Sequence, residues 1–453
     1  MQFLRVGTSG MRGKLAQGLS PDVAVKYLAA LGTYADCGKM VVGRDSRVSS
    51  QLFYELAVSV LTSAGVDVIA VDLAIAAELS FAIKDFGACG GLLVSAGHHA
   101  SDWNSLIPFN QDGSYFNSVQ TQELLDIYHS GDFTHCSWDK VGDVIEVGNS
   151  YKKHYADQLV SSVDIAAVQA ADFNVILDFC NGPGSTVAEY IIEKYKLNFL
   201  LINKCKSGHL PHDPEPRPRN ASQVQTLVTT LNSDAGFLFC SDMSRFAIVA
   251  ETGERLSEEC SYPIVLDYLL KKYDYKGVVV STYCTTKMVD DVVSQNGAKL
   301  VKAEPGQSYV VDKISECGAL IGGEGSGSIS TPEHLPCYDG FLGVLLVLEA
   351  MAKKKTTVSA LKAALPEYHI VKKKIPCNPG QGYSIIRNAR NFFPDAEVSD
   401  VGGIRFDWED GWVNLRPSRT EPILRMTVEH KLKEKATDLA LQVRGLLERL
   451  VSL

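Results

Sequence analysis

Two loops of the sequence combine charged and hydroxyl side chains at spacings suited to a polar ligand. In the loop RPSRTEP, Arg416, Ser418 and Thr420 alternate along a turn bounded by prolines. Guanidinium groups bind phosphate oxygens in pairs, so this loop predicts a phosphate-binding site. In the loop GGEGSGS, Glu324 and Ser326 lie on a glycine-rich backbone that a ligand can approach closely, and a carboxylate accepts hydrogen bonds from vicinal sugar hydroxyls. The alternative for the first loop is an exposed basic turn, and the alternative for the second is a plain connecting loop.

A third polar loop follows an apolar stretch at 90–94 that reads as a buried strand. Its sequence is Ser95-Ala96-Gly97-His98-His99-Ala100. Open α/β sheets place their functional sites at the carboxyl ends of strands, so the position favours a functional loop. An ordinary loop with two solvated histidines is the alternative.

The elements that must position these loops alternate between strands and helices. In the first part of the chain, helical patterns that begin at Pro21 and Gln51 alternate with apolar runs at 40–42 and 91–94. This alternation is typical of an α/β unit with a largely parallel sheet.

The same pattern restarts twice further along the chain, at Val175 and at Gly277. After Pro366 it changes to strand-like segments that end in an amphipathic helix, whose apolar face would carry Leu432. The sequence therefore predicts three similar α/β units and a smaller C-terminal α+β unit. We expect their boundaries at 1–147, 148–256, 257–365 and 366–453.

Composition excludes several classes of protein. The 453 residues carry a net charge of −9, which would repel a phosphate backbone, so we expect no nucleic-acid partner. The longest apolar run, 341–352, is shorter than a membrane span, and the N-terminal stretch has no signal-peptide core. The 11 cysteines include no CxxC pair, so their spacing predicts neither a zinc site nor a disulfide framework. We expect a soluble cytoplasmic protein with no membrane partner.

Four motifs, in order along essentially the whole chain, resemble those of the α-D-phosphohexomutases, the phosphoglucomutase/phosphomannomutase family. They are GTSGMRG at 7–13, VGRDSR at 42–47, GEGSG at 323–327 and RPSRTEP at 416–422. The resemblance implies four domains around a central cleft: three related α/β domains with mixed sheets and a smaller C-terminal α+β domain. It also implies that the ligand is a hexose phosphate.

The resemblance further implies a phosphoserine that exchanges its phosphoryl group with the sugar, and the sequence departs from the family at this centre. Laid against the family's TASHNP loop, Gly97 takes the place of the phosphorylated serine, and His98 matches the histidine that follows it. Ile107 replaces a lysine that the family places near the transferred group. The family's nucleophile is therefore absent.

The family's Mg²⁺ loop, DGDxDR, reads CSDMSR in this chain. Asp242 and Arg245 remain, whereas Cys240 and Ser244 replace the other two aspartates. Mg²⁺ requires several hard oxygen ligands in near-octahedral geometry. We therefore expect that the Mg²⁺ site is lost and that the protein needs no cofactor, and the sequence leaves open whether Cys240 binds a softer metal.

The residues expected to hold the substrate match the family, whereas those of the phosphoserine and metal loops do not. The functional prediction rests on this contrast. Glu324 and Ser326 would accept the sugar hydroxyls, while Arg12 and Arg245 would supply positive charge in the cleft. The phosphate would be clamped by Arg416, Ser418 and Thr420. The sequence thus predicts a protein that binds a hexose phosphate but does not run the phosphoserine and Mg²⁺ cycle, a pseudoenzyme.

Two alternatives remain at this point. The first is an active phosphoglucomutase or phosphomannomutase with a displaced phosphoryl carrier, either Ser95 or His98, in which nearby arginines replace the charge of the metal. The second is a scaffold that binds no sugar. The sugar epimer and the oligomeric state cannot be read from the sequence.

Overall fold

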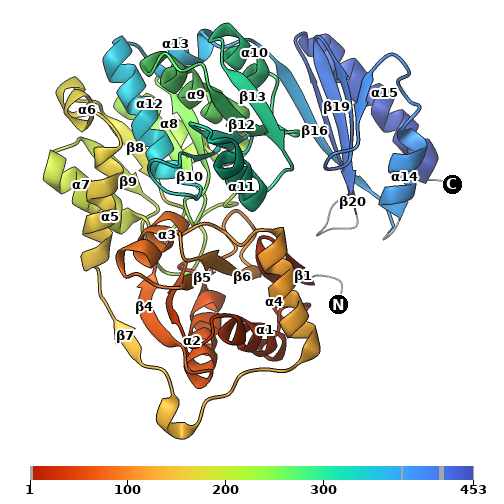
Figure 1. Ribbon diagram of the computed structural model, residues 1–453. Coiled ribbons are helices and arrows are strands. Elements are labelled where there is room, and N and C mark those ends of the chain that lie inside the picture. Colours follow the sequence, from red (N-terminus) through yellow and green to blue (C-terminus); the bar gives the residue numbers. More distant parts are fainter. Residues whose placement is uncertain (1–3, 379–380, 418–422, 452–453) are drawn as a thin grey trace.

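The computed structural model describes residues 4–378, 381–417 and 423–451, and their strands form four separate sheets (Figure 1). The first three sheets pair some strands in parallel and others antiparallel, and helices pack against them. The fourth sheet is antiparallel throughout. This is the predicted fold class of three α/β units and one α+β unit. The exact residue boundaries between the units stay a prediction.

The first unit is built on a seven-stranded sheet with the order β1-β2-β6-β5-β3-β4-β7. Its strands are β1 (Leu4–Gly7), β2 (Gly10–Lys14), β3 (Lys39–Arg44), β4 (Asp67–Leu73), β5 (Gly90–Val94), β6 (Trp103–Asn110) and β7 (Val144–Glu146), and its helices are α1 (Pro21–Tyr34), α2 (Val48–Ser63), α3 (Ala76–Asp85) and α4 (Ser118–Ser130). The sheet is mixed, not largely parallel as the strand–helix alternation predicted. The connection from β5 to β6 is too short for a crossover helix, so β6 must return antiparallel.

The second unit has a four-stranded sheet with the order β11-β10-β8-β9. Its strands are β8 (Val175–Asp178), β9 (Phe199–Ile202), β10 (Ala235–Phe239) and β11 (Phe246–Ala250), and its helices are α5 (Ser150–Ser161), α6 (Ile165–Ala171), α7 (Ser185–Tyr195) and α8 (Ser222–Leu231). The tight turn between β10 and β11 carries the sequence that resembles the metal loop.

The third unit has a sheet with the order β13-β12-β14-β15. Its strands are β12 (Val278–Thr282), β13 (Lys299–Ala303), β14 (Gly322–Glu324) and β15 (Ser328–Ser330), and its helices are α9 (Ser261–Lys272), α10 (Met288–Gln295), α11 (Gln307–Cys317), α12 (Gly340–Lys354) and α13 (Val358–Ala363). The hairpin between β14 and β15 is the glycine-rich loop expected to bind the sugar.

The fourth unit has a sheet with the order β16-β20-β19-β18-β17, and two helices pack against it. Its strands are β16 (His369–Pro376), β17 (Glu397–Ser399), β18 (Ile404–Trp408), β19 (Gly411–Pro417) and β20 (Ile423–His430), and its helices are α14 (Gln381–Ala389) and α15 (Lys433–Val451). Leu432 precedes α15 and is exposed, contrary to the expectation for that residue. The predicted amphipathic helix is otherwise present, and its buried side chains are Ala436, Ala440, Val443 and Leu447.

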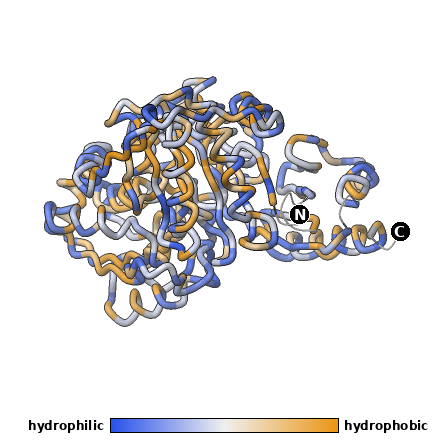
Figure 2. Tube along the Cα trace, turned by 90° about the horizontal axis from the view of Figure 1, so that it is seen from below, coloured by the Kyte–Doolittle hydropathy of each residue, from blue (hydrophilic) through white to orange (hydrophobic). Residues whose placement is uncertain are grey.

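One continuous apolar core joins the second and third units with one face of the first, and α12 lies within it, buried from Gly340 to Met351. The fourth unit has its own core and lies to one side of the other three, as Figure 2 also shows. Among the described helices, none is long and apolar enough to cross a membrane.

Candidate functional site

A buried guanidinium group holds the loop 95–100 in place. Arg47, between β3 and α2, donates from Nη2 to the carbonyls of Gly97 (2.8 Å) and His99 (2.6 Å), and from Nη1 to that of Ala100 (2.7 Å). Its Nε donates to Oδ2 of Asp45 at 3.1 Å, and both side chains are buried. The GRDSR motif therefore fixes the backbone of the loop through charge-assisted hydrogen bonds.

Ser95 is part of this support. Its hydroxyl donates to Oδ2 of Asp45 at 2.8 Å and accepts from the backbone N–H of Gly97 at 3.1 Å. The side chain is fully buried. A hydroxyl engaged in this way, with no access from the cleft, is poorly placed to carry a phosphoryl group.

Gly97 has a backbone conformation that a serine would resist. Its φ is +52°, in the left-handed region, and a Cβ at this position would lie 2.6 Å from Oδ2 of Asp242. The Gly97 carbonyl accepts a hydrogen bond from Ser241 Oγ at 2.9 Å, so the first and second units meet at this residue. The conformation of the loop requires glycine at this position. The loop therefore differs from that of the family in its backbone as well as in the absence of the serine oxygen.

His98 lies half-buried next to the second imidazole of the loop, with its ring centroid 4.3 Å from that of His99. Burial and the positive charge of Arg245 lower the pKa of His98 well below its usual value, and His99, Arg12 and Arg425 act in the same direction. The imidazole is therefore neutral at physiological pH. It carries a nitrogen lone pair in surroundings rich in positive charge.

Arg12 and His99 complete these surroundings. His99 Nδ1 lies 3.1 Å from the carbonyl of Ala96, and its Nε2 lies 3.4 Å from Nη1 of Arg12. Arg12 also donates from Nε to Ser105 Oγ at 3.0 Å. Burial and the charge of Arg245 lower the pKa of Arg12 to about 10, so its guanidinium group still carries full charge at pH 7.

The residues in the metal loop do not fit Mg²⁺. Asp242 Oδ1 accepts hydrogen bonds from Ser244 Oγ (2.7 Å) and Cys240 Sγ (3.1 Å). Burial and the charge of Asp242 raise the pKa of Cys240, which disfavours its thiolate form, and a soft sulfur ligand is a poor match for Mg²⁺. Within the described ranges, no three His, Cys, Asp or Glu side chains converge as a metal site. Ile107, at the position of the family's lysine, is buried in the apolar core and brings no charge.

A polar cleft of about 170 Å³ lies between the second, third and fourth units, and Arg245, Glu324, Ser326 and Arg416 line it together. Glu324 Oε1 accepts from the backbone N–H of Gly306 at 3.0 Å, which orients the carboxylate. Four of the residues predicted to bind the substrate are thus brought to one place. Because Arg245 also acts on the imidazole of His98, the cleft and the loop 95–100 share one electrostatic environment.

Two of the predicted phosphate ligands, Ser418 and Thr420, fall outside the described residues. The structure adds Arg425, which lines the same cleft and is the cross-strand partner of Arg416 in the β19–β20 hairpin. The sequence analysis missed it, although alternation along β20 places it on the same face as Thr427, another cleft residue.

The sequence analysis also missed a charged group that joins the third and fourth units. Lys372, on β16, pairs with Glu259 at 2.6 Å and with Glu258 at 2.9 Å. Glu259 Oε2 accepts from the backbone N–H of Thr286 at 3.1 Å. Burial raises the pKa of Glu259 to about 7, against the opposing effect of Lys372. No motif marked these residues, because their pairing depends on how the two units dock.

Comparison with known proteins decides the family. The models of phosphoglucomutase/phosphomannomutase alpha/beta/alpha domains I, II and III match residues 4–135, 153–253 and 246–368, and the model of the C-terminal domain matches 352–446. The chain belongs to this family. A putative phosphomannomutase from Thermus thermophilus has the same fold, with a TM-score of 0.82, 20% identity, and coverage of 98% of this chain and 99% of that one. The resemblance inferred from the motifs is confirmed.

Similar sequences carry the name of a mutase. A probable phosphoglucosamine mutase from Pyrococcus horikoshii is 30% identical over 449 residues, 98% of each chain, and one from Thermococcus kodakarensis is 31% identical over 450 residues, again 98% of each. An N-acetylphosphoglucosamine mutase from Aspergillus fumigatus has been solved with GlcNAc-6P and magnesium; it is 12% identical, covers 99% of this chain and 96% of its own, and has a TM-score of 0.58.

These similarities correct the functional prediction. The interpretation as a pseudoenzyme that binds a hexose phosphate without mutase chemistry is wrong, because full-length relatives at about 30% identity are named as mutases. The prediction gave too much weight to the missing serine oxygen at Gly97 and to the incomplete metal loop. The similarities favour the alternative named in the sequence analysis, an active mutase with a displaced phosphoryl carrier.

We predict that Glu259→Gln changes how stability depends on pH. The pKa of Glu259 is about 7 in the folded chain, and an unfolded glutamate titrates near about 4.3. The folded state therefore binds this proton more tightly, and the resulting stabilisation, fully present below about pH 4.3, is lost as the pH rises to about 7. The melting temperature of the wild type should fall relative to that of the variant across this window.

The measurement is thermal unfolding followed by circular dichroism between pH 4 and 8. Glu193→Gln, which changes an exposed carboxylate in the second unit, is the control and should follow the wild type. Parallel curves for the wild type and Glu259→Gln would contradict the prediction.

Proposed function

We propose that this protein is a phosphosugar mutase in which His98 carries the phosphoryl group. The observation that supports it most is the neutral imidazole of His98 in surroundings made positive by Arg245 and Arg12. A neutral imidazole is a competent nucleophile toward phosphorus, and guanidinium groups stabilise the charge of the transferred group. Ser95, the other carrier considered, is buried and uses its hydroxyl to support the loop.

The cycle begins when a sugar bisphosphate loads the imidazole. In the productive direction, a hydroxyl of the hexose monophosphate attacks the phosphorus, the N–P bond to His98 breaks and leaves its electron pair on that nitrogen, and the hydroxyl proton goes to the other ring nitrogen. The bisphosphate turns over in the cleft. The imidazole then attacks the other phosphate, the O–P bond breaks, and the sugar oxygen takes back the proton. The isomeric monophosphate leaves, and His98 is phosphorylated again.

Arginines take the electrostatic role that a metal would have. The charges of Arg12, Arg245 and Arg425 all lower the pKa of His98, so the electrostatic potential at its ring is positive and would stabilise a dianionic group bound there. The neutral thiol of Cys240 and the single carboxylate of Asp242 do not suit a hard cation. We therefore propose phosphoryl transfer that does not depend on Mg²⁺.

The substrate side supports a hexose phosphate. Arg416 and Arg425 would bind the phosphate that is not being transferred, while Glu324 and Ser326 would accept sugar hydroxyls across the cleft. Because the relatives are named phosphoglucosamine mutases, glucosamine 6-phosphate is the first substrate to test.

The carrier is tested by loading the protein with a ³²P-labelled hexose 1,6-bisphosphate. We expect label that is stable to alkali and labile to acid, the signature of a phosphoramidate, and we expect mass spectrometry to locate it on His98. His98→Asn should remove both the label and the turnover of glucosamine 6-phosphate, because no nitrogen lone pair of an imidazole remains.

His99→Asn is the matched control, since it changes the neighbouring ring and keeps His98. It should retain the label and lower turnover only in part through its contact with Arg12. Acid-stable label on a serine, or full turnover by His98→Asn, would refute the proposal.

The phosphate assignment is tested with Arg416→Ala. The variant should bind glucosamine 6-phosphate more weakly by about 1.5–3 kcal/mol, because a charge-assisted hydrogen bond to phosphate is lost. Calorimetry measures the affinity. Arg390→Ala removes an exposed arginine that pairs with Asp400 in the same unit and should leave the affinity unchanged. Equal weakening by both variants would show that only general charge matters.

Removal of metal provides a separate test. Turnover should persist in excess EDTA, because the charge on the transferred group is balanced by guanidinium groups. The rate is measured with and without EDTA, and again after Mg²⁺ is restored. A rate that EDTA abolishes and Mg²⁺ restores in the wild type, but not in Asp242→Asn, would contradict a metal-independent mechanism.

A further inference from the structure

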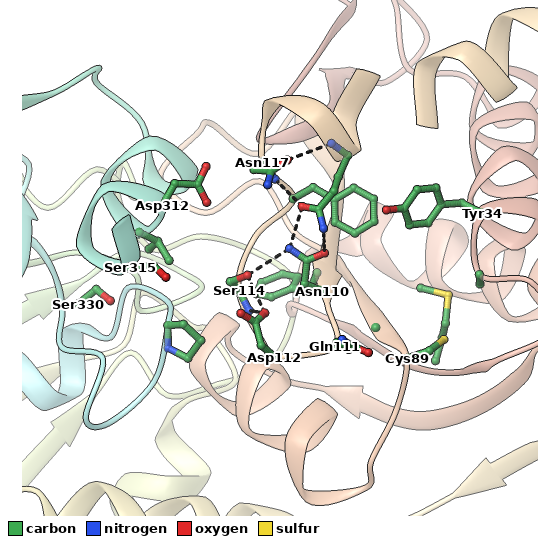
Figure 3. Close-up of a pocket in the computed structure, with 18 of the residues that line it drawn as sticks. Tyr34, Cys89, Asn110, Gln111, Asp112, Ser114, Asn117, Asp312, Ser315 and Ser330 are labelled. Atoms are coloured by element: carbon green, nitrogen blue, oxygen red, sulfur yellow. Dashed lines mark hydrogen bonds between the residues drawn. The ribbon is translucent and has the colours of Figure 1, made fainter. Parts of the chain in front are cut away.

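A second cavity, of about 620 Å³, lies between the first and third units and shares no lining residue with the cleft described above (Figure 3). One wall is the end of β6 and the turn that leads to α4, and the opposite wall is α11 with the segment that follows β15. Its volume falls within the range of small-molecule sites.

The wall from the first unit is fixed by side-chain amides. Asn110 Nδ2 donates to Gln120 Oε1 at 3.0 Å, and Gln120 Nε2 donates back to Asn110 Oδ1 at 2.6 Å. Asn117 Oδ1 accepts from the backbone N–H of Gln120 at 3.0 Å and caps α4. Figure 3 shows this network beside the cavity. A wall held in this way needs little reorganisation to bind a ligand.

The floor of the cavity is apolar. Met40, Phe109 and Phe116 line it from the first unit, and Ile314 lines it from α11. The ring of Tyr34 packs on that of Phe116 with centroids 5.1 Å apart. The four floor side chains are almost fully buried, so the half-buried ring of Tyr34 is the aromatic surface that a carbon skeleton would meet.

The charge of the lining has one sign. Asp112 comes from the first unit and Asp312 from the third, and the lining includes no lysine or arginine among the described residues. The pKa of Asp312 is raised to about 6, mainly by burial and to a smaller extent by the negative charges of Glu316 and Asp112. The positive charge of Lys313 opposes this only weakly. Asp112 is exposed, and its Oδ1 accepts from the N–H (2.9 Å) and the hydroxyl (2.7 Å) of Ser114, while Asp312 is half-buried on the opposite wall. A bound cation would relieve the repulsion of these negative charges.

We propose that this cavity binds an organic ammonium ion with an apolar skeleton, held by Asp112 and Asp312 over the aromatic floor. A hard divalent cation fits less well, because among the described residues no three carboxylate, histidine or cysteine side chains are placed to hold a metal ion, and Glu316 is paired with Lys313. An anion is excluded by the charge of the lining. Nothing in the mutase cycle uses this cavity.

The site is coupled to the sugar-binding loop through α11. Asp312 and Ile314 lie in the middle of this helix, and Gly306, immediately before it, donates its N–H to Glu324 Oε1 at 3.0 Å. A ligand that draws α11 toward the first unit moves the group that orients Glu324. Occupancy of the cavity therefore changes the affinity for the phosphosugar, and this second step rests on the proposed function.

The binding step is tested by calorimetry on the full chain at pH 7.5 with phenethylammonium chloride as the probe. We expect saturable binding with one site per chain, and at least about tenfold weaker binding of 2-phenylethanol, which has the same skeleton without the charge. Asp312→Asn and Asp112→Asn should each weaken binding of the ammonium probe by about tenfold or more. Asp172→Asn, at an exposed position in the second unit, should leave it unchanged.

The absence of saturable binding would overturn the proposal. So would equal affinity for the alcohol, or binding insensitive to both Asp112→Asn and Asp312→Asn. For the coupling, saturating probe should change the dissociation constant of glucosamine 6-phosphate at least about twofold, and the sugar phosphate should change that of the probe by the same factor. A phosphosugar that does not bind at all would refute the proposed function while the ammonium site stands; two independent affinities would refute the coupling alone.

Discussion

The chemistry of this protein depends on one buried guanidinium group. Arg47 forms an ion pair with Asp45 and donates three hydrogen bonds to carbonyls of the loop 95–100. A charge that is removed from water in this way must be fully paired, so the loop has little freedom to adopt another conformation. The places of Gly97 and His98, and the burial of Ser95, all follow from it.

A fixed loop allows the charges around it to act together. Arg12 comes from the first unit, Arg245 from the second and Arg425 from the fourth, and all three lower the pKa of the same imidazole. The three positive charges repel one another when no anion lies between them. Such an arrangement is expected of a site that stabilises a dianionic group. The same field explains how a mutase cycle can be supported where the metal loop offers a single carboxylate and a neutral thiol.

The four units are joined by two different kinds of interaction. The second and third share an apolar core with one face of the first. The fourth has a separate core and meets the third through polar contacts, such as Lys372 with Glu258 and Glu259. Polar contacts can be replaced by water more easily than an apolar core can be separated, which would allow the fourth unit to change its position in the proposed cycle.

The sequence by itself determined the order of the four units and the family, and it predicted the loops that would face a phosphosugar, because strand–helix alternation and loop motifs are local patterns. Only the tertiary structure distinguishes the surroundings of the two candidate carriers. Ser95 and His98 are three residues apart in the sequence, but in the structure Ser95 is buried and donates to Asp45, whereas the pKa of His98 is lowered by arginines from distant parts of the chain. The antiparallel return of β6, the place of Arg425 beside Arg416 and the pairing of Lys372 with Glu259 were likewise missed, because each depends on contacts between residues far apart in the chain.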